Sequence, residues 1–160
     1  MLGLPTPRDE DWNYTNVAPI LRHDFEPVGS QAVADTDANA IAPYLFDGEG
    51  ARLVLVDGHY AAHLSQTDGL PDGVQIQSLR RLLADDPEAL NDRLFELVDT
   101  DTQGFAALNG AFLRDGAVIR LAEGAQVEAP IHVLSLVSGG GAVFGRTLLI
   151  AGAGSRATLV

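Results

Sequence analysis

The chain has 160 residues, of which 46% are hydrophobic and 20% are charged, so it holds enough apolar material for one folded domain, or one and a half. This composition excludes a disordered tail or a fibrous chain. Ten arginines stand against 22 acidic residues, and the formal charge of -12 disfavours nucleic acids and anionic membrane surfaces as partners. The sequence has no lysine and no cysteine, which excludes lysine Schiff bases, the P-loop lysine, thiolate nucleophiles and cysteine-ligated metal clusters.

We expect the beginning of the chain to be mature sequence. The segment MLGLPTPRDED has prolines and acids where a signal peptide needs a basic stretch followed by an apolar run. The sequence also lacks a run of roughly eighteen apolar residues, so it predicts no helix that spans a bilayer. A cytoplasmic protein is the expectation that follows.

The first fifty residues are predicted to form an extended arm with short helices. Four of the eight prolines lie there ahead of a fifth at Pro43, and the stretch 30–42 is small and polar with little periodicity. We therefore expect residues 1–50 to pack loosely on the rest of the chain.

A compact unit is predicted for residues 51–115. Its first part holds two β-competent stretches, RLVLV and HYAAHLS, joined by Asp57-Gly58. This dipeptide favours a type I′ hairpin turn because glycine tolerates a positive φ. The sequence therefore predicts an antiparallel hairpin that begins at Arg52.

Helical periodicity follows the hairpin. Large apolar residues recur there at spacings of three and four, namely Leu79, Leu82, Leu83, Leu90, Leu94, Leu97, Val98, Phe105, Leu108 and Phe112. The tripeptide Asp86-Pro87-Glu88 is typical of a helix start, because proline is tolerated in the first turn and acids interact favourably with the positive end of the helix dipole. We expect amphipathic helices, the second of which runs from this start to about Val98.

After Asp115-Gly116 the periodicity drops to two. Short β-competent runs are separated by glycine turns with no helix between them, and they cover residues 117–122, 125–128, 130–137, 145–152 and 155–160. This pattern suits a β-meander or the first coils of a β-solenoid over residues 116–160. Because the last run reaches Val160 without a capping element, we expect the chain to be a fragment that continues into more β-structure.

Two phrases carry a resemblance to a known family. Residues 3–15 (GLPTPRDEDWNYT) resemble the opening of the SufD family, scaffold subunits of the SUF iron–sulfur cluster assembly machinery, with the acids around Arg8 spaced slightly differently. Residues 105–112 (FAALNGAF), followed by Asp115-Gly116-Ala117 and Pro130-Ile131-His132, resemble the family's entry into its β-helix. The resemblance spans essentially the whole chain, and the first phrase favours SufD over its paralogue SufB.

The resemblance implies an α+β fold and a scaffold function. It implies a mixed helix and hairpin domain followed by a right-handed parallel β-helix, truncated at Val160, and a protein that is not an enzyme. SufB and the ATPase SufC are the implied partners, with an iron–sulfur cluster held transiently on the complex and ATP on the partner subunit. The family residues proposed to take part in cluster building would lie beyond Val160. We therefore assign no catalytic, cofactor-binding or metal residue to this segment.

The first phrase also has a plain physical interpretation. Trp12 and Tyr14 are large side chains with one polar atom each, and the acids before them can cap a short helix. We expect both aromatic residues to dock the arm onto the body of the protein.

Four constellations are candidates for a site. Asp57, His59 and His63 could approach a metal, because residues two and four apart on a strand share one face, but paired histidines on an exposed hairpin are usually solvated. His132 alternates with Ile131 and Val133, which favours an outward-facing strand histidine over a catalytic one.

Glycines near the end of the chain form the third constellation. Gly152, Gly154 and Ala157 fit the G-x-G-x-x-A dinucleotide fingerprint, yet no helix pattern or later acid follows, so a turn between strands is the better interpretation. The adjacent acids Glu10 and Asp11, like Asp85 and Asp86, are interpreted as solvated faces or helix starts.

Two other functions stay open beside the scaffold. One is a small acidic β-rich domain that binds carbohydrate or protein, for which aromatic platforms on one face would be expected. The other is a nucleotide-binding enzyme acting through Gly152 and Gly154.

Overall fold

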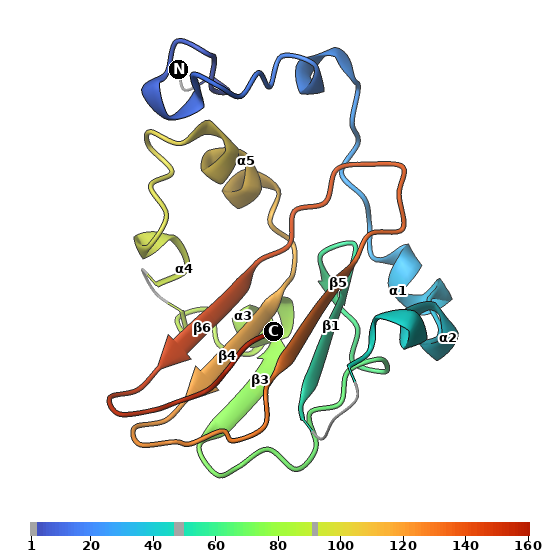
Figure 1. Ribbon diagram of the computed structural model, residues 1–160, viewed down its shortest axis with the longest axis vertical. Helices are drawn as coiled ribbons and strands as arrows, with labels where there is room; N and C mark the ends of the chain where they lie inside the picture. The colour runs from blue at the N-terminus through green and yellow to red at the C-terminus, as the bar shows by residue number, and fades with distance from the viewer. Residues whose placement is uncertain (1–2, 47–49, 91–92) are drawn as a thin grey trace.

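The computed structural model describes residues 3–46, 50–90 and 93–160. Two three-stranded sheets pack face to face, and helices cover the outer face of each (Figure 1). The α+β class expected from the sequence is confirmed. The longest described helix has nine residues, far short of the roughly 20 that span a bilayer, and none of the described helices qualifies as a membrane span.

The predicted hairpin is confirmed at its turn and first strand, but the second β stretch, HYAAHLS, is wrong beyond Tyr60, because residues 62–64 form a turn. Strands β1 (Arg52–Val56) and β2 (His59–Tyr60) pair antiparallel, with Val56 opposite His59. The turn residues Asp57 and Gly58 both have positive φ, 49° and 79°, which is the type I′ geometry.

The first sheet has the order β2-β1-β5. Strand β5 (His132–Leu136) runs parallel to β1, with Arg52 opposite His132. Both faces of β1 are covered: Leu53 and Leu55 face the core between the sheets, while Val54 and Val56 face α1 and α2. A strand buried on both faces needs a continuous apolar run, which explains the sequence RLVLV.

The second sheet has the order β3-β4-β6. Strand β3 (Val74–Ser78) pairs antiparallel with β4 (Ala117–Leu121), and β6 (Thr147–Ala151) pairs parallel with β4. Parallel pairing excludes a β-meander between β4 and β6, since neighbouring meander strands are antiparallel.

The last part of the chain passes twice along the same path. Ala117 pairs with Thr147 and Gln126 with Arg156, so each partner lies thirty positions further on, and Ile131 pairs with Leu159. The runs predicted as strands over 125–128 and 155–160 are reduced to these isolated bridges. Tight turns at equivalent positions, 122–125 and 152–155, precede both runs.

The helical region agrees with the prediction in part. Helices α3 (Leu79–Asp85) and α5 (Gly104–Phe112) lie where the apolar spacing predicts them. The predicted helix from Pro87 to Val98 is wrong at its start, because residues 87–90 form turns and α4 spans only Arg93–Glu96. The Asp86 carboxylate accepts a hydrogen bond from Glu88 N (3.1 Å), which stabilises a local turn in place of a helix. Residues 91 and 92 of the predicted helix lie outside the described residues.

The arm carries five short helices: η1 (Glu10–Trp12), η2 (Ile20–Arg22), α1 (Gln31–Asp35), α2 (Ala38–Ile41) and η3 (Ala42–Tyr44). It passes over α5 and descends to place α1 and α2 beside the first sheet (Figure 1). Most of residues 30–42 are exposed, but Ile41 is 1% exposed and packs among Val54, Val56 and Leu64. Ala32 and Val33 pack against the same cluster, so this segment is anchored at a few apolar positions.

We predict that Gly116→Ala destabilises the protein by roughly 1–3 kcal/mol. A Cβ at this position would overlap the carbonyl oxygen of Arg146, which accepts a hydrogen bond from Ala117 N (2.8 Å) and joins β6 to β4. Urea denaturation measures the change. The control is Gly29→Ala, where a Cβ meets nothing within 4 Å and a change within about 0.5 kcal/mol is expected. Equal stability of the two variants would contradict the close approach.

Candidate functional site

A buried carboxylate lies where the helices give way to parallel strands. Asp115, only 2% exposed, sits between α5 and β4 and accepts hydrogen bonds from Tyr60 N (3.1 Å), Ser78 Oγ (2.8 Å) and Arg80 N (3.0 Å). Three donors replace the hydration that the carboxylate loses on burial. We call Asp115 and these three partners the Asp115 junction.

The junction ties β2, α3 and β4 together. Ser78 is the N-cap of α3: its hydroxyl oxygen accepts from Arg81 N (3.1 Å) while the hydroxyl donates to Asp115. The carboxylate also lies at the N-terminal end of α3, where the helix dipole favours negative charge. Asp115 therefore fixes the position of the hairpin and of α3 relative to β4.

His59 borders the junction. Its Nδ1 lies 4.0 Å from Asp115 Oδ2 and has no hydrogen-bond partner among the described residues. The imidazole is 7% exposed, so the expectation of a solvated histidine pair on the hairpin is wrong for this residue. Gly58, in the hairpin turn, packs closely against the backbone of Gly145.

The residues proposed as a possible metal site are separated by the fold. The Asp57 carboxylate accepts from Ser138 N (2.8 Å) and Ser138 Oγ (2.5 Å), which joins the hairpin turn to the end of β5. His63 is exposed, with its Nε2 3.0 Å from Thr36 O. Within the ranges that the structure describes, no three histidine, aspartate or glutamate side chains gather as a metal site.

Arg146, the residue immediately before β6, makes a second polar link. Its Nη1 donates to Leu94 O (2.7 Å) and its Nη2 to Asn109 Oδ1 (2.6 Å), while the guanidinium lies 5.1 Å from the Phe95 ring centroid. Burial lowers the pKa of the Arg146 guanidinium from its ordinary value. The Asn109 amide also donates to Gly145 O (3.3 Å), so the asparagine of the FAALNGAF phrase joins α5 to the start of β6.

The N-terminal phrase docks the arm through one of its two aromatic residues. The Trp12 ring lies 5.5 Å from Phe105 of α5, and the backbone of Gly3 approaches Gly104 closely. Trp12 therefore anchors the arm as expected. The same expectation is wrong for Tyr14, whose side chain is fully exposed.

The glycine constellation lies in the turn after β6, and His132 lies on β5. Gly154 (φ 67°) is part of the turn after β6, Ser155 Oγ donates to Gly152 O (2.7 Å), and the chain continues to the bridge at Arg156 with no helix anywhere in residues 152–160. A dinucleotide fingerprint needs a helix at this point, so the interpretation as a glycine turn holds. His132 is half-buried on the outer face of β5, with its ring 4.6 Å from Phe46.

The paired acids do not form a convergent site. Glu10 and Asp11 lie in the exposed helix η1, and Asp85 makes an exposed ion pair with Arg81 (3.6 Å). Asp86 stabilises the turn described above. Surface pairs of this kind contribute little to stability.

Comparison with known proteins agrees with the two phrases. A family model described as the SufBD protein N-terminal region matches residues 1–133. This chain belongs to the SufBD family. Both phrases that carry the resemblance contain residues that link parts of the structure. Residues 3–15 dock the arm onto α5. Residues 105–117 include Asn109, which binds Arg146, and Asp115 of the Asp115 junction.

Two curated relatives extend the match. An iron–sulfur cluster assembly SufBD family protein of Synechocystis sp. (strain ATCC 27184 / PCC 6803 / Kazusa) is 32% identical over 135 residues, which cover 84% of this chain and 29% of the relative. The iron–sulfur cluster assembly protein SufD of Escherichia coli (strain K12) is 32% identical over 94 residues, which cover 58% of this chain and 21% of the relative. The chain therefore spans less than a third of either relative.

Sequence reasoning did not anticipate the roles of Asp115 and Arg146. The sequence places Asp115 in a turn and in a family phrase, and Arg146 at the start of a strand. A local signal is present in both cases, since each charged residue stands just before a strand with a glycine beside it. A charge at such a position needs partners, but sequence alone does not say which.

We predict that Asp115→Ala lowers the free energy of unfolding by at least about 2 kcal/mol, because it leaves the donors of Tyr60, Ser78 and Arg80 buried without their acceptor. Urea denaturation at neutral pH measures the loss. The matched control is Asp85→Ala, which removes a carboxylate that is 71% exposed and should change stability by about 0.5 kcal/mol or less. A loss no larger than that of the control would contradict the junction.

We predict that Arg146→Lys lowers the free energy of unfolding by about 1–2 kcal/mol although the charge is kept. A lysine ammonium cannot reproduce the planar fork that reaches Leu94 O and Asn109 Oδ1 together. Arg81→Lys on the exposed face of α3 is the control and should leave the midpoint of urea unfolding unchanged. If both variants unfold at the parent midpoint, the fork does not contribute to stability.

Proposed function

We propose that this chain is the N-terminal part of a SufD-like scaffold that supports iron–sulfur cluster assembly in a complex with SufB and the ATPase SufC. Family membership over residues 1–133 is the observation that carries the proposal. Both curated relatives are named as iron–sulfur cluster assembly proteins, one of them as SufD.

The β-structure of such a scaffold would continue as a right-handed parallel β-helix. Support comes from the parallel pairing in which Ala117 meets Thr147 and Gln126 meets Arg156, each pair thirty positions apart. Parallel crossovers are right-handed in nearly all proteins. Strand β6 is an edge of its sheet within the described residues, so its outer backbone groups could pair with a following coil.

The chemistry of the chain suits a supporting role over a catalytic one. It contains no cysteine to ligate a cluster. Its buried carboxylates among the described residues, Asp57 and Asp115, accept hydrogen bonds that join segments of the fold. In the proposed complex, other parts of the assembly supply the cluster ligands and SufC hydrolyses ATP. This segment holds the first strands of the scaffold in position.

The parallel pairing further implies that the N-terminal elements cap the β-structure that follows them. The hairpin and α3 would close the first coil, since β1 pairs with β5 and β3 pairs with β4. Parallel arrays need such a terminal element, because an uncovered first coil would expose its backbone groups and its core.

The proposal is tested by co-expression of the complete tagged gene product with SufB and SufC of the same organism. We expect both partners to remain bound through a wash at high salt and to migrate with the tagged protein in size-exclusion chromatography. An Arg81→Gln variant is the surface control and should retain both partners. If SufB and SufC assemble with each other while neither binds the tagged protein, the scaffold proposal is wrong.

A further inference from the structure

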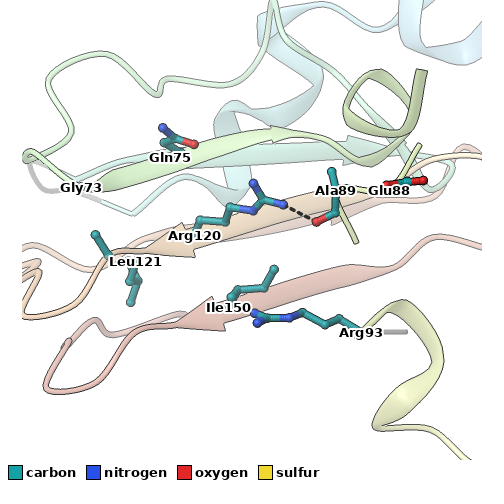
Figure 2. A pocket seen from close by; sticks show the side chains of 9 residues that line it. Gly73, Gln75, Glu88, Ala89, Arg93, Arg120, Leu121 and Ile150 are labelled. Atoms are coloured by element: carbon teal, nitrogen blue, oxygen red, sulfur yellow. Dashed lines mark hydrogen bonds between the residues drawn. The ribbon is translucent and has the colours of Figure 1, made fainter. Parts of the chain in front are cut away.

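A pocket of about 530 Å³ opens on the outer face of the sheet β3-β4-β6, beside the helical layer (Figure 2). Its floor is a row of directly paired residues, because Gln75 of β3 is opposite Arg120 of β4, and Arg120 is opposite Ile150 of β6. Glu88, Ala89 and Arg93 contribute to the wall on the helical side. None of these residues belongs to the Asp115 junction or to the phrases that match the family.

Arg120 is held in place within this pocket. Its Nη2 donates to Ala89 O (2.9 Å), the bond drawn in Figure 2, and its side chain is half-buried on the sheet. A guanidinium has five N–H donors, and no other protein acceptor takes a hydrogen bond from the Arg120 side chain among the described residues. Fixed donors of this kind lose little conformational freedom when they bind a ligand.

Arg93 supplies a second positive charge. It extends from the start of α4 toward Ile150, on the side of the pocket opposite β3 (Figure 2). Glu88 is the acidic residue in the pocket, and it lies within 4.0 Å of neither guanidinium, since the ion pairs found among the described residues are Arg81–Asp85 and His59–Asp115. Among the described residues that line this pocket, two arginines therefore stand beside one acid, in a chain whose net charge is -12.

We infer that this pocket binds a small oxyanion, a free carboxylate or phosphate compound, through the guanidinium groups of Arg120 and Arg93. The planar guanidinium matches the oxygens of either anion and can form paired charge-assisted hydrogen bonds. The Gln75 amide can add a donor, and Ile150 offers apolar surface to the rest of the ligand. The net negative charge of the chain repels anions at long range, so binding depends on these local contacts.

The inference is tested on the full chain by nuclear magnetic resonance, with titrations of sodium phosphate and sodium succinate at constant ionic strength and neutral pH. We expect saturable shifts of the amides of Gln75, Arg120 and Ile150, with a dissociation constant in the millimolar range for at least one anion. The tighter of the two anions identifies the ligand as a phosphate or a carboxylate.

Variants that remove a positive charge or a negative charge from the pocket should change the affinity in opposite directions. Arg120→Gln should weaken binding about tenfold and Arg93→Gln about threefold, while Glu88→Gln should tighten it because the repelling carboxylate is gone. Arg93 is exposed, so its variant keeps the test valid if Arg120→Gln fails to fold. The matched control, Arg81→Gln, removes an exposed positive charge from α3 and should leave the affinity unchanged.

Two results would overturn the inference. The first is a set of shifts that grow linearly with both anions and never saturate. The second is equal weakening by Arg81→Gln and Arg120→Gln, which would show a general charge effect in place of a site.

Discussion

The buried carboxylate of Asp115 is the interaction on which the rest of the structure depends. It accepts hydrogen bonds from the hairpin, from the N-cap of α3 and from the first turn of that helix, at the point where the chain enters β4. A buried carboxylate without these donors would be strongly unfavourable. Asp115 can therefore be buried only when its three partners are in position, and their backbone and hydroxyl donors in turn need the carboxylate as acceptor. The close packing of Gly116 against Arg146 then brings β6 alongside β4.

A second set of contacts links these strands to the N-terminal arm. Arg146 joins the backbone at Leu94 to Asn109 of α5, and α5 in turn receives Trp12 from the N-terminal phrase. Together these links give a continuous path from the arm through α5 to the first parallel strands, as the arrangement in Figure 1 shows. The two phrases that the chain shares with the SufBD family fall on this path, which gives a physical reason for their residues.

Local patterns in the sequence predicted local structure well and long-range pairing poorly. Asp57-Gly58 predicted the hairpin, because a type I′ turn depends on two adjacent residues. The pairing of β1 with β5 could not be derived, since nothing in RLVLV specifies a partner some eighty positions later. Asp86-Pro87 is not a helix start for a related reason. The hydrogen bond to the Asp86 side chain can stabilise an isolated turn as well as the first turn of a helix. Leu90, after this turn, is buried against the sheet.

The candidate site was less predictable than the fold. His59 has the sequence context of an exposed hairpin residue, but it is buried beside Asp115. Tyr14 and Trp12 are alike in sequence, yet only Trp12 meets an aromatic partner on α5. Such outcomes depend on which surfaces meet in three dimensions.

The central claim is that β4 and β6 begin a parallel scaffold that the N-terminal segment closes. A structure of the complete gene product tests it most directly. The account predicts a further strand that pairs in parallel with the free edge of β6, about thirty residues after β6 in the chain, as β6 follows β4. An antiparallel strand or a helix against that edge would contradict it.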